Sequence, residues 1–475
     1  MRAIMILSSC VLIACRSHDA ATTDASTISD ARIGSAFDEA RAFDPILRAT
    51  SLHAGVVNGA VTLTGTVSTV SAKSRAEELV GILKGARSLV DQIVVNAPDR
   101  SDVDIVTSVT DSLHDDPATH SANVQITSRG QAVTLRGDVD SSTQRELIAD
   151  AVSRVAGVRD IRLLLQIRGT SGPKEIAADI DARLRDDARV DGPRVAVVVD
   201  RRSVTLSGVV GSLVQRSAVI ADAWVAGVTS VDAPALRVDW SEWMRARTAM
   251  VKKPTTDASV VMAITHALAD DVRVGAPLPT VTADHGVVTL SGNVVDFRAA
   301  RAAVRVANRA RGVQSVQDRL SVPPAKQEDD ATIEKQVEQS VYNDIAVSDA
   351  RSIQITTTRA KVTVRGSAAS QEEKIAIEHD VGQVAGVIAI EDDVQVVGYG
   401  PTTHVASSTT IQSHANESIF ADARIPSDTV KVSVAANGDA TLTGLVDDGS
   451  EARAATADAE SAGAAHIINL VRVRP

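Results

Sequence analysis

Aromatic residues are scarce in this chain of 475 residues, since Phe, Trp and Tyr together make up only 2% of it. Apolar residues still reach 44%, so the cores must be built from Val, Ile, Leu and Ala. Small aliphatic side chains suit small cores, and a chain of this length exceeds what one core supports. The composition therefore predicts several small domains.

An excess of basic residues is also missing. The chain has 49 Lys and Arg residues against 60 Asp and Glu residues, which leaves a net charge of −11. A protein whose whole surface binds nucleic acid needs a broad basic footprint. We therefore expect no nucleic-acid partner, and any binding of anions must be local.

Sequence motifs of known catalytic sites are absent. The 10 histidines show no metal-ligand spacing, and the chain contains no HExxH, CxxC or P-loop sequence. Ser171 and Lys174 match the S-x-x-K pattern of acyl-transfer enzymes, but Gly172 and Pro173 prevent the helix that would bring the lysine under the serine. We therefore expect no enzymatic activity, no cofactor, no metal site and no small-molecule substrate.

One short stretch is present six times. Residues 61–65 read V-T-L-T-G, and five related stretches end at later glycines. The six glycines are Gly65, Gly137, Gly208, Gly292, Gly366 and Gly444. The alternation of apolar residues with threonine predicts a half-buried strand. We expect the glycine to close this strand, where a side chain would obstruct a turn or a closely packed helix.

Before each of these strands lies a segment with apolar residues at helical spacing, such as Ile176, Ile180 and Leu184. In copies two to six an aspartate follows three residues after this stripe, and Asp44 takes the same place after the weaker stripe of copy one. The six aspartates are Asp44, Asp116, Asp187, Asp271, Asp344 and Asp422. Metal binding is one interpretation, but the neighbouring residues vary, so a role in the turn that ends the helix is favoured.

The rest of the repeat can be predicted in the same way. Asn58-Gly59 and His285-Gly286 indicate tight turns between two strands. A second helical stretch runs to another glycine, which fits a left-handed helix end, and a last strand follows through a right-handed crossover. The predicted fold class is α+β: a tandem array of six small α-β-β-α-β domains, each a three-stranded mixed sheet covered by two helices.

The order of these elements resembles the BON domain of bacterial osmotic-stress and nodulation-related proteins. The resemblance rests on the helix that ends near an aspartate, the V-T-L-T-G stretch, a basic and alanine-rich helix, and Gly-Val before the last strand. Copies one and six depart from it, with Gly85-Ala86 and Gly463-Ala464 at the last of these positions. The predicted domains are residues 31–96, 102–168, 173–239, 257–322, 331–397 and 410–474.

The amino terminus reads as an export signal over residues 1–14. Residues 12–15 read L-I-A-C, which resembles the lipobox of bacterial lipoproteins and implies cleavage before Cys15 and lipidation of its thiol. The alternative is an ordinary cleaved signal in which Cys15 is incidental. Cleavage would remove Cys10, so no thiol would remain for disulfides. Residues 15–30 have no apolar period and are expected to be a disordered tether.

The second helix of the fourth copy carries a stripe of arginines. They are Arg298, Arg301, Arg305 and Arg309. Steps of three, four and four residues place them within about 80° of one another around a helix. One interpretation is an anion-binding face for phospholipid headgroups. The other is a solvated face whose arginines pair with acids from other repeats.

The linker at residues 240–256 contains two of the three tryptophans, Trp240 and Trp243, next to basic residues. Aromatic rings beside basic side chains suit a membrane interface. They equally suit packing of the linker against repeats three and four.

These features together predict a non-enzymatic cell-envelope protein, on the periplasmic side and anchored through Cys15, with the outer membrane favoured over the inner. The BON resemblance implies that the repeats associate with anionic phospholipid surfaces and support envelope integrity, including under osmotic stress. The candidate lipid contacts are Arg298, Arg301, Arg305, Arg309, Trp240 and Trp243. The alternative function is a periplasmic scaffold that docks other envelope proteins or peptidoglycan-associated partners.

Overall fold

A computed structural model describes residues 28–474 apart from residues 45, 121, 191–194, 249–254, 324–328, 344–346, 348–349, 369–370, 385, 397–406 and 465. Over these residues the chain forms six separate three-stranded sheets. In each sheet the first two strands are antiparallel and the last two are parallel, as in the pairings β1·β2 and β2·β3. The α-β-β-α-β repeat with its mixed sheet is therefore confirmed.

The first three repeats share this order of elements. Repeat 1 comprises α1 (Asp30–Phe43), β1 (His53–Val57), β2 (Ala60–Val67), α2 (Val70–Ile82) and β3 (Ser88–Val95). Repeat 2 comprises α3 (Asp102–Asp115), the short α4 (Pro117–His120), β4 (Asn123–Arg129), β5 (Ala132–Val139), α5 (Ser142–Ser153) and β6 (Asp160–Ile167). Repeat 3 comprises α6 (Pro173–Asp186), β7 (Val195–Asp200), β8 (Ser203–Val210), α7 (Leu213–Asp222) and β9 (Ser230–Val238).

A linker helix, α8 (Trp240–Thr248), precedes the second half of the chain. Repeat 4 comprises α9 (Asp257–Asp270), β10 (Thr280–Asp284), β11 (Val287–Asn293), α10 (Phe297–Arg309) and β12 (Ser315–Ser321). Repeat 5 comprises α11 (Asp330–Asn343), η2 (Ala350–Ser352), β13 (Gln354–Thr358), β14 (Lys361–Ala368), α12 (Gln371–Gln383) and β15 (Ala389–Val396). Repeat 6 comprises α13 (Ser408–Ala421), β16 (Lys431–Val434), β17 (Ala440–Val446), α14 (Gly449–Ser461) and β18 (Ile467–Val473).

A carboxylate at the start of the first helix ties that helix to the hairpin turn. The carboxylate of Asp102 accepts hydrogen bonds from the Ser128 hydroxyl and from the backbone N–H groups of Gly130 and Gln131, the last two at 2.9 Å. These bonds, that of Ser128 foremost, hold the pKa of Asp102 below its usual range. The equivalent carboxylates in three other repeats are Asp30, Asp257 and Asp330. The contact fixes the hairpin over the amino-terminal end of the helix.

The six recurring glycines lie inside their strands, so the expectation that they close the strand is wrong. In β5 the strand continues past Gly137 to Val139. Gly137 has a φ of +150°, and a Cβ there would lie 2.0 Å from the carbonyl oxygen of Asn123. The chain that enters the first strand passes against the second strand at this point. At Gly137, and likewise at Gly65, Gly366 and Gly444, glycine is required because of that close backbone approach and not because of a helix. A Cβ at Gly292, in contrast, would have no atom nearer than 4.0 Å, and only the φ of +108° favours glycine there.

Each repeat has its own hydrophobic core, built from the aliphatic residues that the sequence offers. In repeat 3 the predicted helical stripe of Ile176, Ile180 and Leu184 is buried. It packs in one cluster with Val204 and Leu206 of β8. Small domains with separate cores explain why the chain needs so few aromatic side chains.

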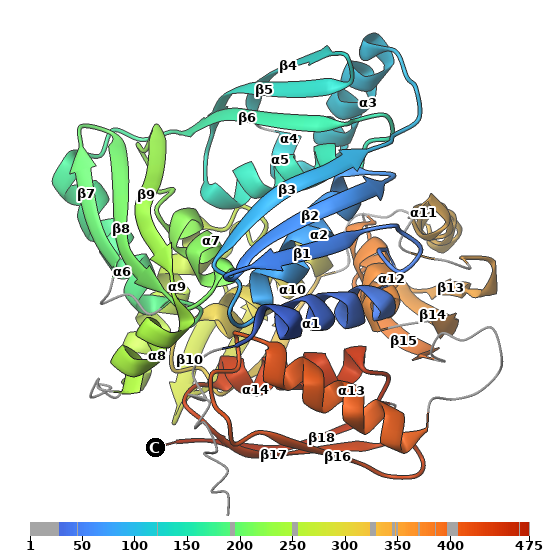
Figure 1. The fold of residues 1–475 in the computed structure, drawn as a ribbon. Coiled ribbons are helices and arrows are strands. Elements are labelled where there is room, and N and C mark those ends of the chain that lie inside the picture. Colours follow the sequence, from blue (N-terminus) through green and yellow to red (C-terminus); the bar gives the residue numbers. More distant parts are fainter. Residues whose placement is uncertain are drawn as a thin grey trace, which may run out of the picture.

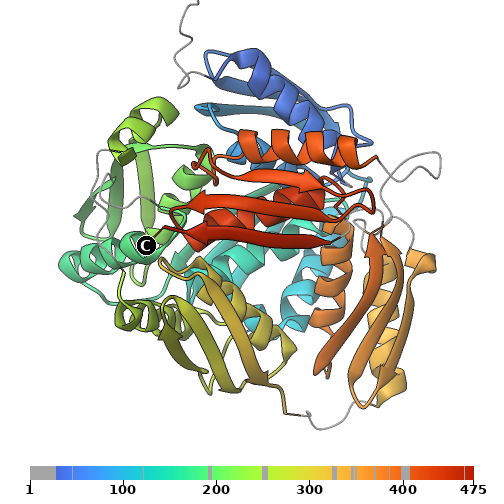
Figure 2. The ribbon, with the colours of Figure 1, turned by 90° about the horizontal axis from the view of Figure 1, so that it is seen from below.

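The repeats form a closed cluster, and their second helices meet inside it. Helix α2 contacts α5 and α7, α10 contacts α12, and α12 contacts α14. Figures 1 and 2 show the sheets of repeats 2 and 6 on opposite sides of the molecule, with α5 and α14 between them. The outer faces of these sheets therefore face away from the centre.

The Gly137→Ala variant should open repeat 2. Its Cβ would meet the Asn123 oxygen and the residue would hold a positive φ, so we expect a loss of roughly 2–4 kcal/mol in the free energy of local opening. Hydrogen exchange of the β4 and β5 amides measures this loss. Gly130→Ala is the matched control, because Gly130 has a φ of +58° with open space around it, and about 1 kcal/mol is expected. Equal effects of the two variants would contradict the role of the close approach.

Candidate functional site

An aspartate ends the first helix in the repeats where this position is described. In repeat 2 the Asp116 carboxylate accepts a hydrogen bond from the backbone N–H of Ala118 at 2.9 Å. The same bond to the residue two positions later is made by Asp44, Asp187, Asp271 and Asp422. The predicted role in the helix-ending turn is confirmed at these positions, and Asp344 lies outside the described residues.

Repeats 3 and 6 extend this turn into a buried cluster of three charged residues. In repeat 6 the guanidinium of Arg424 binds Asp422 and lies 3.3 Å from Asp458 of α14. Burial, and then the nearby Asp422 carboxylate, raise the pKa of Asp458 well above its usual range. The same three positions in repeat 3 are Asp187, Arg189 and Asp222. The sequence signal that could have revealed the cluster is an arginine two residues after the aspartate together with a second aspartate in the second helix, at Asp222 and Asp458. Repeat 4 has the arginine, Arg273, without the second aspartate.

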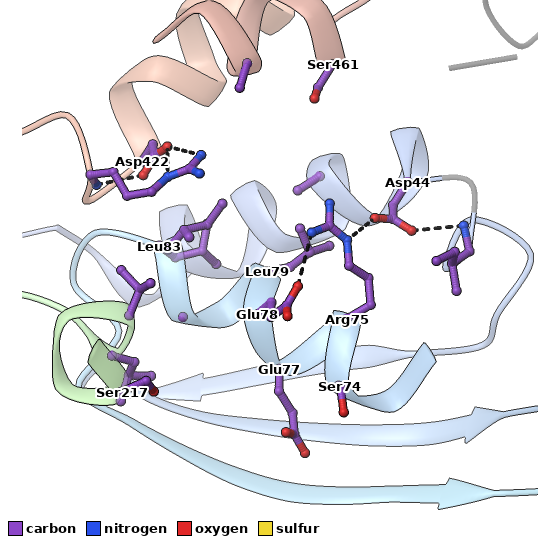
Figure 3. A pocket seen from close by; sticks show the side chains of 18 of the residues that line it. Asp44, Ser74, Arg75, Glu77, Glu78, Leu79, Leu83, Ser217, Asp422 and Ser461 are labelled. Atoms are coloured by element: carbon purple, nitrogen blue, oxygen red, sulfur yellow. Dashed lines mark hydrogen bonds and ion pairs between the residues drawn. The ribbon is translucent and has the colours of Figure 1, made fainter. Parts of the chain in front are cut away.

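The repeats enclose a central cavity of about 2310 Å³. Its lining includes residues from every repeat, with α2 and α7 contributing the largest shares. Figure 3 shows Arg75 of α2 pointing between Asp44 and Glu78, and the nitrogen–oxygen distances are 2.7 Å and 3.3 Å. Asp422 of repeat 6 lines the same cavity. The helix-ending aspartates therefore stand where repeats meet.

Arginines and carboxylates that line this cavity form ion pairs with one another. Arg75 and Arg424 bind acids of their own repeats, and Arg298 of repeat 4 binds Asp116 of repeat 2 at 3.3 Å. Sites for small molecules usually have volumes of about 300–1,000 Å³, so this space is larger than one such ligand requires. Over the described part of the chain, no group of three or more His, Cys, Asp or Glu side chains could hold a metal ion.

The arginine stripe on α10 divides into two halves. Arg298 pairs with Asp116, and Arg301 pairs with Glu378 of repeat 5 at 3.1 Å, so these two arginines bind acids of other repeats. Among the described residues, Arg305 and Arg309 have no hydrogen-bond or ion-pair partner. Burial, and then repulsion from Arg273 and Arg301, lower the pKa of Arg305 to about 10. With a pKa of about 10, the Arg305 guanidinium remains charged at neutral pH.

The linker tryptophans have a packing role. Trp243 is only 2% exposed, and its ring lies 5.3 Å from the Trp240 ring. Helix α8 packs on β8 of repeat 3, and Arg247 binds Asp447 and Glu451 of repeat 6 at 2.8 Å and 2.9 Å. The linker thus joins repeats 3 and 6, where packing against repeats 3 and 4 was the expectation. A ring as buried as that of Trp243 cannot enter a lipid surface.

The expected anchor, Cys15, lies outside the described residues. Within the described ranges, no helix has the length and the apolar character needed to span a membrane.

The sequence and fold define a class of protein. The pattern of the BON domain matches residues 29–97, 101–169, 174–239, 256–324, 329–398 and 407–475. These matches cover most of the chain, so the protein belongs to the BON domain family.

Similarity to individual proteins is more limited. The chain is 31% identical over 146 residues to osmotically-inducible protein Y of Escherichia coli (strain K12), a match that covers 29% of this chain and 72% of that protein. Two structures of CdsD, a structural protein of the type III secretion system of Chlamydia trachomatis, are 14% identical and cover 46% of this chain. They span 100% and 98% of their own chains with a TM-score of 0.14, which is too low to support any inference.

The Asp458→Asn variant tests the buried cluster through its pH dependence. An aspartate of the unfolded chain ionises near a pKa of about 3.9, whereas Asp458 in the folded protein keeps its proton to higher pH. The unfolded state therefore releases this proton first, and the folded state loses stability as the pH rises from the unfolded pKa towards the folded pKa. Asparagine has no proton to lose. The melting temperature of the variant should therefore fall less than that of the wild type between about pH 5 and about pH 8.

Asp439→Asn is the control for this measurement, because Asp439 lies beside Asn437 in the connection between β16 and β17, outside the buried cluster. Its pH dependence should match that of the wild type. An Asp458→Asn variant with the wild-type pH profile would show that the Asp458 carboxyl ionises normally in the folded state.

Proposed function

We propose that this protein is a non-enzymatic, lipid-anchored protein of the cell envelope, whose BON repeats associate with phospholipid surfaces and support envelope integrity under osmotic stress. Membership in the BON family and similarity to a protein named for its osmotic induction support this function. The lipobox-like sequence at Cys15 supports the anchor.

The observation that carries the lipid contact is the unpartnered half of the arginine stripe. Arg305 and Arg309 stand one turn apart on α10. Two further arginines and Asp271 lie near Arg305, whereas Arg189, Arg273, Glu146 and Asp187 lie near Arg309, so arginines outnumber acids once the pair itself is counted. Like charges that are partly buried repel one another, so an anion that binds between them lowers the free energy of the cluster. A phosphate group accepts hydrogen bonds from guanidinium groups in a matching geometry. Two arginines at this spacing therefore suit an anionic headgroup.

The anchor would make weak headgroup contacts sufficient. Each basic residue near an anionic membrane contributes about 1 kcal/mol, so Arg305 and Arg309 supply about 2 kcal/mol. Contacts of this strength bind only weakly on their own. A lipid on Cys15 would hold the repeats at high local concentration near the membrane, which makes such contacts productive.

Replacement of Arg305 and Arg309 by Gln should weaken binding to anionic vesicles about 30-fold, the ratio that about 2 kcal/mol gives. The chain from residue 16 onward is mixed with phosphatidylglycerol-containing and with neutral vesicles, and binding is measured by co-sedimentation. Added salt should weaken the binding, because the attraction is electrostatic.

The control for the vesicle experiment replaces Arg136 and Arg319 by Gln. Both lie exposed on outer sheet faces, so this variant loses the same charge. Equal loss of binding in the two double variants would mean that net charge, and not the α10 cluster, attracts the membrane. Equal binding of the wild type to neutral and anionic vesicles would refute the headgroup contact.

A second candidate function, a scaffold for other envelope proteins, is favoured by the outer face of repeat 6. Leu445, Ile468 and Leu470 lie on one face of β17 and β18 and are 45%, 50% and 57% exposed. Exposed apolar clusters of this kind mark protein contact sites. Triple replacement by Ser should leave vesicle binding unchanged, and loss of vesicle binding in that variant would place the lipid contact on repeat 6 instead.

A further inference from the structure

Two pairs of repeats meet through the same backbone contact. At the seam of repeats 1 and 6, the backbone N–H of Lys84 donates to the carbonyl of Ala421 at 2.7 Å, and the N–H of Ala423 donates to the carbonyl of Ile82 at 2.6 Å. Leu83 and Asp422 thereby form an antiparallel bridge between the end of α2 and the end of α13. Two residues more than 300 positions apart in the sequence thus become neighbours.

The seam of repeats 4 and 3 repeats this geometry. The N–H of Arg311 donates to the carbonyl of Asp186 at 2.7 Å, and the N–H of Ala188 donates to the carbonyl of Arg309 at 2.9 Å. Asp187 and Ala310 form the bridge. We call each such contact a clasp, defined by this pair of backbone bonds between the end of a second helix and the end of a first helix.

In both clasps, the residue at the end of the second helix whose backbone N–H donates to the other repeat has a basic side chain. Lys84 and Arg311 each precede the second glycine of their repeat. The Lys84 ammonium donates to the carbonyl of Ile419 at 3.5 Å, and the Arg311 guanidinium donates to the carbonyls of Arg185 and Asp187 at 2.8 Å and 3.1 Å. Cations suit these carbonyls, which are the unpaired acceptors at a helix carboxyl end. The other four repeats have alanine before the second glycine.

The receiving side also has a sequence signature. Repeats 3 and 6 read Asp-Ala-Arg at the end of the first helix, and the alanine supplies the N–H of the clasp. Repeats 1 and 2 have Pro45 and Pro117 at this position. Proline has no N–H, so these two repeats cannot receive a clasp. The donor repeats are therefore marked by a basic residue before the second glycine, and the receiving repeats by Asp-Ala-Arg, which repeat 4 replaces by Asp-Val-Arg.

We propose that the clasp is a recognition surface for another BON repeat, in which a basic residue before the second glycine binds a partner whose first helix ends in Asp-Ala-Arg, and that it joins the first repeat to the last. Further contacts strengthen the seam of repeats 1 and 6. Arg32 binds Glu417 at 3.3 Å and lies 3.7 Å from the centre of the Phe420 ring. Figure 1 shows α1 and α13 side by side at this seam.

The Ala423→Pro variant removes the hydrogen bond from the Ala423 N–H to the Ile82 carbonyl, and the backbone before it already has a conformation that proline tolerates. Asp422 has φ −75° and ψ 116°, an extended conformation that a following proline favours, and Asp44 before Pro45 has nearly the same angles. In the chain from residue 16 onward, hydrogen exchange of the Lys84 amide should become at least about tenfold faster, which corresponds to about 1.4 kcal/mol. Protection of the β17 amides should persist and would show that repeat 6 remains folded.

The matched control is Val272→Pro, which places proline at the same position of repeat 4, where no clasp is received. It should leave exchange of the Lys84 amide unchanged. Lys84→Arg should also leave it unchanged, because repeat 4 uses Arg311 there, whereas Lys84→Glu should accelerate it by the same factor as Ala423→Pro. The Lys84 variants leave the sequence of repeat 6 intact, so they still test the clasp if Ala423→Pro unfolds that repeat. Wild-type exchange in both Ala423→Pro and Lys84→Glu, or equal acceleration by Val272→Pro, would overturn the proposal.

Discussion

The aspartate that ends the first helix is the contact on which the rest of the structure depends. Its carboxylate binds backbone N–H groups of the following turn, as Asp44 does with Ile46 and Leu47 at 3.0 Å. The chain can then leave the helix at once and enter the hairpin, where the carboxylate at the start of the same helix holds the turn. Each first helix thus ends in a turn that its own aspartate fixes, and its last carbonyls can accept hydrogen bonds from another repeat, as that of Ala421 does from Lys84.

This geometry also explains how two pairs of repeats are joined. The ends of the first helices in repeats 3 and 6 receive the ends of second helices from repeats 4 and 1. The second helices are thereby drawn to the centre, around a cavity whose acids and bases bind one another. The outer sheet faces of repeats 2 and 6 point away from this centre.

The fold within a repeat could be predicted from the sequence because its signals are local. Alternation at residues 61–65 predicts a strand, the spacing of Ile176, Ile180 and Leu184 predicts a buried helical face, and both are confirmed. The role of the strand glycines could not be predicted, because it depends on a chain segment that crosses a neighbouring strand.

The contacts between repeats could not be predicted from the sequence, for a related reason. The spacing of the four arginines places them on one side of their helix. Two of them bind Asp116 and Glu378, which belong to other repeats and which no local pattern could reveal. The partner of the linker helix likewise proved to be repeat 6, through Arg247. Periodicity shows which side of a helix is polar, and only the tertiary arrangement shows what that side meets.

The radius of gyration in solution tests most directly whether the six repeats form one closed body. Small-angle X-ray scattering from the chain that begins at residue 28 should give a radius of about 22 Å, the value for a compact chain of this length. A row of separate repeats would give roughly twice that value, since each repeat would then add to the length. A radius in that larger range would contradict the closed arrangement and the clasps that hold it.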